Sequence, residues 1–528
     1  MGAALPPTLN LDIRTNPGRQ RCRSLQASLL ATWEHCYERV DSAAVIKCNN
    51  LPTEHRDSIK YNHLHRRKDK FVNLGRRSRS LRFTAFFLLH LGIVFTSCLS
   101  GFPLYAQSTQ APASGLIPCG HFSDIFLRPQ NTPAERSPTR IALMSARWST
   151  LQTTAAGFEK TRVPLVAWDG SRLVPSQYND DSGLDYYVPR LATLLHINLA
   201  MAADLFIGGI VIFSSALGLA GLMQVLKGKW LKVWALCEIV LLAVLSVRIG
   251  DVYVVQSAIV IAAVPWILYL SRNWKGALHY PFLLAVGILV GIANFVRAQA
   301  GMPVLLFSLI LLAFYGDASG KRRILLVTCL MAGLAGSTLY FRHAFVVRDV
   351  YIQNHESINM QRAPHQHPLW HSVYIGLGFV SNPYVPGGYC DQAGLNAVQR
   401  VSPTTSFFSP EYDRILGQQV VQLAMTHPYV VLVNVAAKLG ILQLIALVAG
   451  NIGLLAAIFY RKPLSLEAAF WIATAIGIFQ GLLVLPSIRY ILGGIAMLVL
   501  YSLVSIDHAL TQTKEPRLST VPRLEHDA

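Results

Sequence analysis

The sequence predicts an all-α membrane protein that crosses the bilayer many times. Apolar residues make up 52% of the chain and charged residues only 14%, whereas soluble domains carry roughly a quarter charged residues. The apolar residues gather in long runs, and a bilayer core about 30 Å thick needs roughly 20 apolar residues per crossing helix. Because lipid offers the backbone no hydrogen bonds, these runs must be helical. We expect about ten transmembrane helices.

The runs set the order of the elements. Residues 1–81 are polar and basic without apolar periodicity, which predicts a disordered cytoplasmic tail or an over-extended start. Residues 82–506 form the transmembrane domain, and residues 507–528 form a second cytoplasmic tail. The end of the first run resembles a signal-peptidase site, but its length favours an uncleaved helix. The expected spans are 83–106, 205–223, 233–248, 257–270, 281–296, 302–315, 324–341, one span within 429–460, 466–485 and 490–506.

The run at 429–460 is too long for one helix perpendicular to the membrane. We expect its first part, around Asn434 and Lys438, to lie at the membrane interface. The segment 186–204 alternates apolar and basic residues in the manner of a second interfacial helix, although a plain juxtamembrane connection would look the same.

Basic residues predict the orientation, because Lys and Arg near the ends of spans stay in the cytoplasm. They cluster before the first span and in alternate short loops, which places both termini inside. The two long polar segments, about 107–204 and 342–428, are then outer loops that carry interfacial helices. The net charge of +18 is therefore a topology signal and an attraction to anionic membrane lipids, and it does not indicate a nucleic-acid partner.

Cysteine and histidine spacing predicts no metal site. His365, His367 and His371 lie near one another, but no second cluster completes a tetrahedral set of ligands. Only Cys119 and Cys390 fall in the expected outer loops, and the sequence leaves open whether they form a disulfide or two free thiols.

Acidic residues just before the second span are the candidate catalytic groups. They are Asp180, Asp181 and Asp185. A carboxylate at the outer face can take a proton from an attacking hydroxyl group. The flanking Asn179 and Gly183 also suit an ordinary solvated turn. A divalent cation could bind such acids, but oxygen-ligand sites need several donors, so we treat a metal as optional.

Four basic residues lie at the expected outer ends of later spans: Arg297, Arg489, Lys438 and Arg342. Ionisable residues at this depth are costly and often mark function, and the guanidinium group of arginine matches phosphate oxygens. Any one of these side chains could instead extend to lipid phosphates without a specific role. Together they are candidates for binding an anionic lipid head group.

Aromatic and histidine side chains are candidates for binding an acceptor or a sugar. Trp370, His371 and Tyr374 recur near helical spacing in the second outer loop, and Tyr253 lies with Asp251 in the short turn after the third span. Simple packing would give the same spacing.

The chain resembles the C-type (GT-C) membrane glycosyltransferases, and among them the protein O-mannosyltransferases and lipid A aminoarabinose transferases of the family 39-like group. The resemblance covers roughly residues 82–506 and rests on the order of the parts: an inner N-terminus, an acidic outer loop, hairpins of helices, a second outer loop and a late Arg-Tyr turn. The segments 180–187, 367–378 and 409–412 look like those of bacterial members.

The resemblance implies an inverting glycosyltransferase that uses a polyprenyl phosphate-linked sugar as donor. The acceptor would be an envelope lipid, glycan or protein at the periplasmic face of a bacterial inner membrane, and no cofactor would be required. We expect Asp181 to be the base, followed by Asp180 and then Asp185. In this family the acid usually follows the first helix closely, and here it comes later.

Two other functions fit the same features. A secondary transporter also has about ten spans with charges at membrane depth, but such proteins usually contain two matching halves, and this sequence shows no repeat. A lipid-linked glycan ligase or polymerase would also face outward, with its chemistry led by arginine and histidine.

Overall fold

The computed structural model describes residues 139–513, except residues 142, 144, 177–180, 273, 317, 357–367, 387–389 and 408. The expected tail at 1–81, the expected first span at 83–106 and the candidate Asp180 lie outside the described residues. The regular secondary structure of the described residues is helical apart from one small hairpin, a minor departure from the all-α prediction. In the hairpin, β1 (Val166–Trp168) pairs antiparallel with β2 (Leu173–Pro175).

The long helices form the bundle. They are α5 (Leu199–Val225), α6 (Lys229–Ile249), α7 (Val254–Ser271), α8 (His279–Val296), α9 (Met302–Phe314), α10 (Gly320–His355), α14 (Pro428–Phe459), α15 (Leu464–Leu483) and α16 (Ile488–Gln512). The other described helices are α3 (Ser145–Thr161), α4 (Gly183–Leu195), α11 (Leu369–Gly376), α12 (Asp391–Val401) and α13 (Pro410–Thr426).

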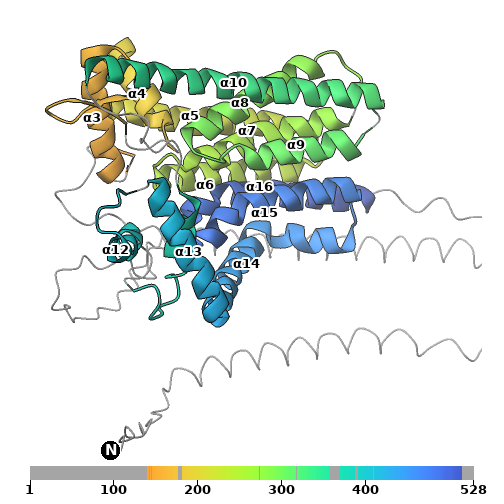
Figure 1. The fold of residues 1–528 in the computed structure, drawn as a ribbon. Helices are drawn as coiled ribbons and strands as arrows, with labels where there is room; N and C mark the ends of the chain where they lie inside the picture. The colour runs from red at the N-terminus through yellow and green to blue at the C-terminus, as the bar shows by residue number, and fades with distance from the viewer. Residues whose placement is uncertain are drawn as a thin grey trace, which may run out of the picture. The chain divides into compact units, whose positions relative to one another are not determined.

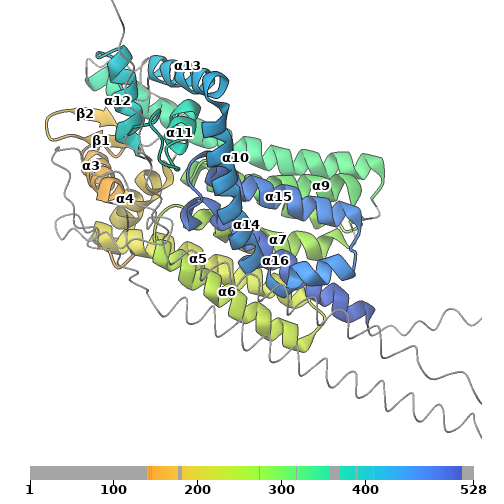
Figure 2. The same ribbon diagram turned by 90° about the horizontal axis from the view of Figure 1, so that it is seen from below.

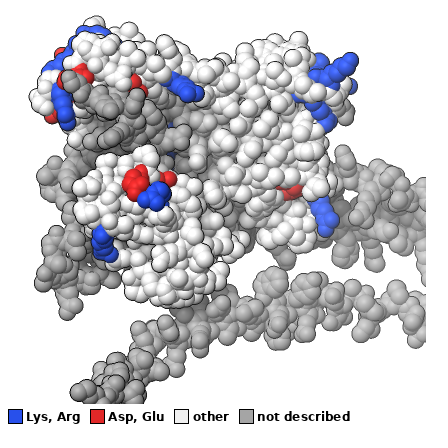
Figure 3. Space-filling model, viewed as in Figure 1, with Lys and Arg blue, Asp and Glu red and all other residues white. Residues whose placement is uncertain are grey.

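Eight of the described helices are long and apolar enough to cross a membrane, which confirms an α-helical integral membrane protein. The helix α9 has only 13 residues and would extend about 20 Å at 1.5 Å per residue, less than the thickness of the bilayer core. It is therefore not among the eight, and the expectation of a span at 302–315 stays a prediction. The face drawn in Figure 3 shows an uncharged belt between the charged ends of the bundle.

The helices α7 and α16 form the centre of the bundle. In the most apolar window of each span, 78% of the residues of α7 and 89% of those of α16 are buried, against 17% in α14. The helix α7 packs against α5, α8, α9 and α16, and α16 also packs against α14 and α15. Helices that are apolar on all sides and peripheral to this pair expose their outer faces, as expected for contact with lipid.

Small residues allow α8 and α10 to pack closely. A Cβ atom added at Gly287 would lie 2.0 Å from the carbonyl oxygen of Leu330, and one added at Gly333 would lie 2.1 Å from that of Leu284. Such contacts between backbones are the usual means of helix association in membranes, where no hydrophobic effect drives helices together.

The short helices gather at one end of the bundle, which we call the loop end. Figures 1 and 2 show α3, α4, α12 and α13 at this end. The opposite end, called the basic end, carries the turn between α9 and α10 with Lys321, Arg322 and Arg323 nearby. Segments that lie about 200 residues apart in sequence therefore share one end, as the sequence predicts for its two long polar segments.

Two helices depart from the predicted boundaries. The helix α10 continues to His355, well into the expected second outer loop, because Ala344, Arg348 and Ile352 are buried at helical spacing. The helix α14 bends at Asn451, where the backbone is not helical (φ 37°, ψ −133°). It does not bend near Lys438, which is buried within the helix, and the expectation that the first part of this run lies at the membrane interface stays a prediction.

The extended end of α10 supports the hairpin. Ile352 packs with Val166 and Leu173 in a small buried cluster, and Glu356 accepts a hydrogen bond from the backbone N–H of Leu173 over 2.9 Å. On the other side, Gly157 of α3 leaves room for the strand, because a Cβ atom there would lie 2.3 Å from the carbonyl oxygen of Val166. The hairpin is thus fixed between α3 and α10.

Candidate functional site

A buried cluster of charges lies at the loop end, centred on Asp181. One carboxylate oxygen of Asp181 accepts a hydrogen bond from Arg297 over 2.6 Å, and the other forms an ion pair with Arg147. The side chain of Asp181 is 2% exposed and those of the two arginines are 10% exposed. Charges so far from water persist only when they are paired, so these three side chains form one unit.

The turn between α6 and α7 supplies the second acid and an aromatic ring. Nε of Arg147 lies 3.0 Å from a carboxylate oxygen of Asp251, which is fully buried. The ring of Tyr253 lies beneath both guanidinium groups, with its centroid 4.7 Å from Arg297 and 5.6 Å from Arg147. An aromatic face attracts cations at these distances, so the turn holds both arginines in place.

Local structure brings Asp181 and Arg297 together. Arg297 immediately follows the end of α8, and the side chain of Asn294 accepts a hydrogen bond from Gly301 over 2.8 Å, which closes the turn into α9. The helix α4 begins against this point. A Cβ atom at Gly183 would lie 2.5 Å from Cα of Val296, so glycine is required for the approach that places Asp181 beside Arg297.

Aromatic packing holds α4 in this position. Tyr186 lies in a buried cluster with Phe295 of α8 and Phe341 of α10. The rings of Phe295 and Phe341 are stacked, with their centroids 3.8 Å apart, and Tyr186 meets both of them edge to face. The start of α4 is therefore fixed to two helices of the bundle.

Asp185 lies in the first turn of α4 and is bound by the segment that leaves the hairpin. The hydroxyl group of Ser176 donates a hydrogen bond to one carboxylate oxygen of Asp185, and the backbone N–H of Ser176 is held by the carbonyl group of Leu165 over 3.0 Å. The second carboxylate oxygen of Asp185 accepts no hydrogen bond from the part of the chain that the structure describes.

The two acids titrate differently. Burial alone would raise the pKa of Asp181, but the charges of Arg147 and Arg297 outweigh it and hold the pKa below its ordinary value. Burial raises the pKa of Asp185 to about 7, although the hydrogen bond from Ser176 and the charge of Arg147 act in the opposite direction. Two neighbouring carboxyl groups with separated pKa values are typical of acid and base chemistry.

The formal charges of the cluster cancel. Two arginines face two acids, Asp181 and Asp251, while Asp185 is close to its titration point at neutral pH. An anionic ligand would therefore have to displace a carboxylate from its arginine or bring a further cation into the cluster.

Among the predicted cations outside the cluster, Arg489 is linked to it through the neighbouring residue. It precedes Tyr490, whose ring lies edge to face against Tyr253 with the centroids 5.2 Å apart. Arg489 is half-buried at the start of α16, and its side chain makes no hydrogen bond or ion pair with the described residues. The residue next to Arg489 therefore contacts the cluster, and no described acid neutralises the charge of Arg489.

The other two predicted cations lie elsewhere. Nζ of Lys438 donates hydrogen bonds to the carbonyl oxygens of Leu482 and Leu483, over 3.0 and 3.2 Å, and so satisfies the end of α15. Arg342 is exposed on α10, next to the buried Phe341. The structure gives Lys438 a capping contact and gives Arg342 no partner among the described residues.

Two of the predicted acceptor-binding residues are buried in a separate cluster around α11, α12 and α13. His371 is fully buried, with one ring nitrogen 2.7 Å from the hydroxyl group of Tyr412 and the other 3.1 Å from Asp391. Tyr374 packs in the same apolar core. In this arrangement both residues join the three short helices.

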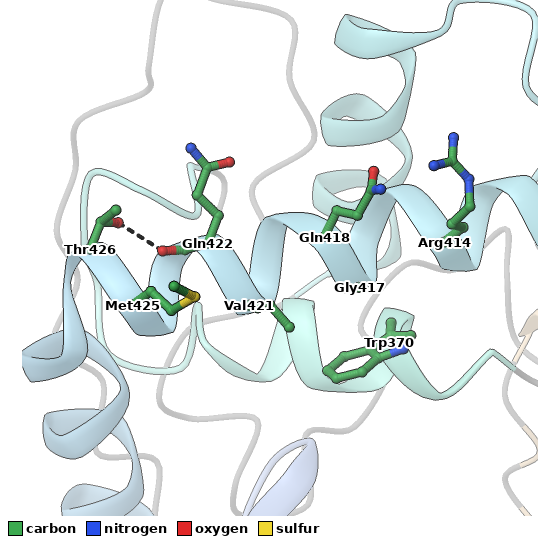
Figure 4. A pocket seen from close by; sticks show the side chains of 8 residues that line it. All are labelled: Trp370, Arg414, Gly417, Gln418, Val421, Gln422, Met425 and Thr426. Carbon is green, nitrogen blue, oxygen red and sulfur yellow. Dashed lines mark hydrogen bonds between the residues drawn. The ribbon is translucent and has the colours of Figure 1, made fainter.

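The third, Trp370, lines an open groove along α13 with a volume of about 520 Å³. Figure 4 shows Trp370, Val421 and Met425 on the apolar side of the groove, with Gln418 and Gln422 pointing away from them. The indole ring fits over Gly417, where a Cβ atom would lie 2.9 Å from the ring.

No group of three or more His, Cys, Asp or Glu side chains in the described part of the chain is arranged to hold a metal ion. Cys390 is disulfide-bonded, and Cys119, the partner that the sequence offers, lies outside the described residues.

Sequence reasoning did not identify Arg147 or Ser176. Arg147 lies on α3, which forms within the first expected outer loop. The only feature of the sequence that indicates this helix is a run of 17 residues without proline. Ser176 carries no signal at all, since its role depends on the hairpin that delivers it to Asp185.

Comparison with known proteins gives no further identification, because no protein family, no curated protein and no solved structure matches the chain.

Proposed function

We propose that this protein is a membrane glycosyltransferase that transfers a sugar from a polyprenyl phosphate carrier to an acceptor hydroxyl group on the outer face of the membrane. The observation that supports the proposal is the buried cluster of Asp181, Arg147, Arg297 and Asp251 beside Asp185 at the loop end. Transfer from a phosphodiester donor needs a base for the acceptor and cations for the leaving phosphate, and this cluster contains both kinds of group.

In the proposed reaction the acceptor oxygen attacks the anomeric carbon from the side opposite the phosphate. The bond between that carbon and the phosphate oxygen breaks, and the configuration inverts. The proton of the acceptor hydroxyl group passes to a carboxylate of the protein. The carrier leaves as a phosphate monoester with one more negative charge than in the donor, and nearby guanidinium groups stabilise that charge.

Asp185 is the better supported base. Its pKa of about 7 allows it to accept a proton near neutral pH, and one of its oxygens has no hydrogen-bond donor among the described residues. Both oxygens of Asp181 are engaged by arginines, which lowers its basicity. We therefore assign to Asp185 the role that the sequence gave first to Asp181, and to Asp181 the positioning of the two arginines.

Arg489 supplies the additional positive charge that the neutral cluster lacks. Binding of the donor phosphate between Arg489 and the Tyr253 turn would add one anion and one cation together, which avoids an uncompensated buried charge. Arg297 lies over the ring of Tyr253. The proposal requires no metal, and a divalent cation remains optional.

The proposed orientation places the loop end outside the cytoplasm of a bacterial inner membrane. The Lys and Arg residues of the short turns at the basic end support it, through the preference of such residues for the cytoplasm. The disulfide at Cys390 supports it as well, since disulfides persist in oxidising compartments.

Transfer can be tested with purified full-length protein, radiolabelled polyprenyl phosphate sugars and a membrane extract as the source of acceptor. We expect labelled acceptor with the native protein, loss of at least 100-fold with Asp185→Asn, and little change with Glu411→Gln, an exposed acid on α13. Full activity of the Asp185→Asn variant would contradict the assignment of the base. Carrier-independent uptake of a solute, with no labelled acceptor from any donor, would favour a transporter.

A further inference from the structure

A second groove lies at the loop end, on the side of α4 that faces away from the acids. Its volume is about 570 Å³. It lies between the last part of α3, the part of α4 from Tyr187 onward and the beginning of α5. The residues that line it are Phe158, Arg162, Tyr187, Arg190, Leu191, Thr193, Leu194 and Phe206. The proposed transfer reaction uses none of these side chains.

The floor of the groove is apolar and continues onto the outer surface of α5. The rings of Tyr187 and Phe206 are stacked, with their centroids 5.4 Å apart. Leu194 at the edge is 75% exposed, and further along α5 Ile212 and Phe213 are 72% and 68% exposed. Exposed apolar residues on a membrane-spanning helix face lipid, so the groove opens onto the acyl-chain region.

Two arginines border the groove. Arg162 is exposed just beyond the end of α3, and Arg190 lies over the ring of Tyr186, with its guanidinium carbon 3.9 Å from the ring centroid. Arg190 also hydrogen-bonds the neutral hydroxyl groups of Tyr186 and Tyr340. Neither arginine forms an ion pair with an acid in the described ranges. The positive charge of this border is therefore not balanced by the protein itself.

The groove lies beside the start of the apolar helix α5, where lipid head groups are expected. Phe206 is in the second turn of α5, close to where the apolar run of that helix begins, and α4 precedes it as a short helix with exposed apolar residues at its end. Arginine at this depth attracts anionic lipids, at about 1 kcal/mol for each cation near the surface.

We propose that this groove binds one anionic phospholipid of the surrounding membrane. The phosphate of the lipid lies between Arg162 and Arg190, and one acyl chain lies along Leu191, Leu194 and Phe206. An amphiphile with a negative head group matches both the unbalanced cations at one side of the groove and the apolar floor that opens to the bilayer. A soluble anion would match only the cations, and a neutral lipid would match only the floor.

Native mass spectrometry of the full-length protein tests this proposal. The protein is purified in detergent, exposed to equal amounts of phosphatidylglycerol and phosphatidylcholine, and the adducts of each are counted. We expect the native protein to retain phosphatidylglycerol preferentially. The Arg162→Gln/Arg190→Gln variant should lose this preference by roughly thirtyfold, from two cations near the surface.

A matched control removes two exposed arginines at the same end but outside the groove, Arg172→Gln/Arg400→Gln, and should retain the preference. Filling the floor with Leu191→Trp tests the apolar part separately, and it should reduce phosphatidylglycerol binding while both arginines remain. The thermal unfolding of every variant is measured alongside, and Arg162→Lys/Arg190→Lys, which keeps both charges, should restore binding.

Equal retention of the two lipids by the native protein would overturn the proposal. So would unchanged binding of phosphatidylglycerol by the Arg162→Gln/Arg190→Gln or the Leu191→Trp variant, or displacement of the lipid by inorganic phosphate alone, which would indicate an anion site without a lipid chain. None of these outcomes depends on the transfer reaction, so the failure of either proposal leaves the other intact.

Discussion

Arg147 on α3 binds Asp251 in the turn between α6 and α7, although 104 positions separate them in the chain. Nε of Arg147 lies 3.0 Å from one carboxylate oxygen of Asp251, while the end of the same guanidinium group pairs with Asp181. One arginine thus ties a helix of the loop end to the central part of the bundle. It also holds the acid that faces Arg297.

Replacing Arg147 should destabilise the protein and abolish transfer. Arg147→Gln leaves Asp251 buried without its charged partner, and breaking a buried ion pair of this kind costs about 3–5 kcal/mol. We expect a marked fall in the thermal unfolding temperature of the detergent-solubilised protein. Arg172→Gln, which removes an exposed arginine paired with Asp169, is the control and should unfold as the native protein does. An unchanged unfolding temperature for Arg147→Gln would show that the ion pairs are not formed in solution.

The pH dependence of transfer should follow Asp185. If this acid must be ionised to accept a proton, activity rises with pH through the pKa of about 7. Ser176→Ala removes a hydrogen bond that lowers this pKa, so the half-point of the rise should move to higher pH, with the rate at alkaline pH largely retained. Profiles of kcat/KM from about pH 5 to 9 measure the shift. A half-point that stays in place in the Ser176→Ala variant would argue against Asp185 as the base.

The stability of the folded protein should fall as the pH rises from about 4 to 7, and Asp185→Asn should reduce the fall. A raised pKa means that the folded state holds a proton that the unfolded state releases, so stability is full below the unfolded value of 3.8 and declines until the pH reaches about 7. At ~1.4 kcal/mol per pH unit, the loss amounts to at most about 4 kcal/mol. Unfolding temperatures at acidic and alkaline pH should therefore differ less in the variant. An identical difference in both proteins would contradict this.

Two glycines on α10 should respond to alanine in opposite ways. Gly333 touches the backbone of α8, since a Cβ atom would lie 2.1 Å from the carbonyl oxygen of Leu284, whereas nothing lies within 4 Å of a Cβ atom at Gly336. Gly333→Ala should separate the helices and lower the unfolding temperature. Gly336→Ala should leave it unchanged or raise it, because alanine favours a helix by about 1 kcal/mol over glycine. Equal effects of the two substitutions would mean that α8 and α10 are not in close contact.

The sequence predicted much of the bundle because the bilayer imposes a simple rule. An apolar run such as 281–296 must form a helix in lipid, and α8 ends at Val296, as expected. The same rule does not apply to residues outside the apolar runs. The continuation of α10 to His355 depends on the packing of Ile352 against the hairpin, and hydropathy does not report such contacts.

The candidate site was partly visible in the sequence. Asp181, Asp185, Arg297 and Tyr253 could be selected because acids, arginines and aromatic residues at the ends of spans are chemically unusual. The pairing of these residues could not be deduced from spacing. Lys438 shows the limit clearly, since a lysine at the end of a span suggests a functional cation, while its contacts satisfy the carbonyl groups at the end of α15.

The amino-acid order by itself determined that this chain is an integral membrane protein, that most of its helices lie where the apolar runs lie, and that its polar segments meet at one end. Those features follow from the cost of placing polar groups in lipid, which acts on each segment separately. Only the tertiary structure decided that Arg147 joins the cluster, that Asp181 is paired and that Asp185 has a pKa of about 7. Burial and Coulomb interactions depend on distances between segments remote in sequence, and only the folded chain sets those distances.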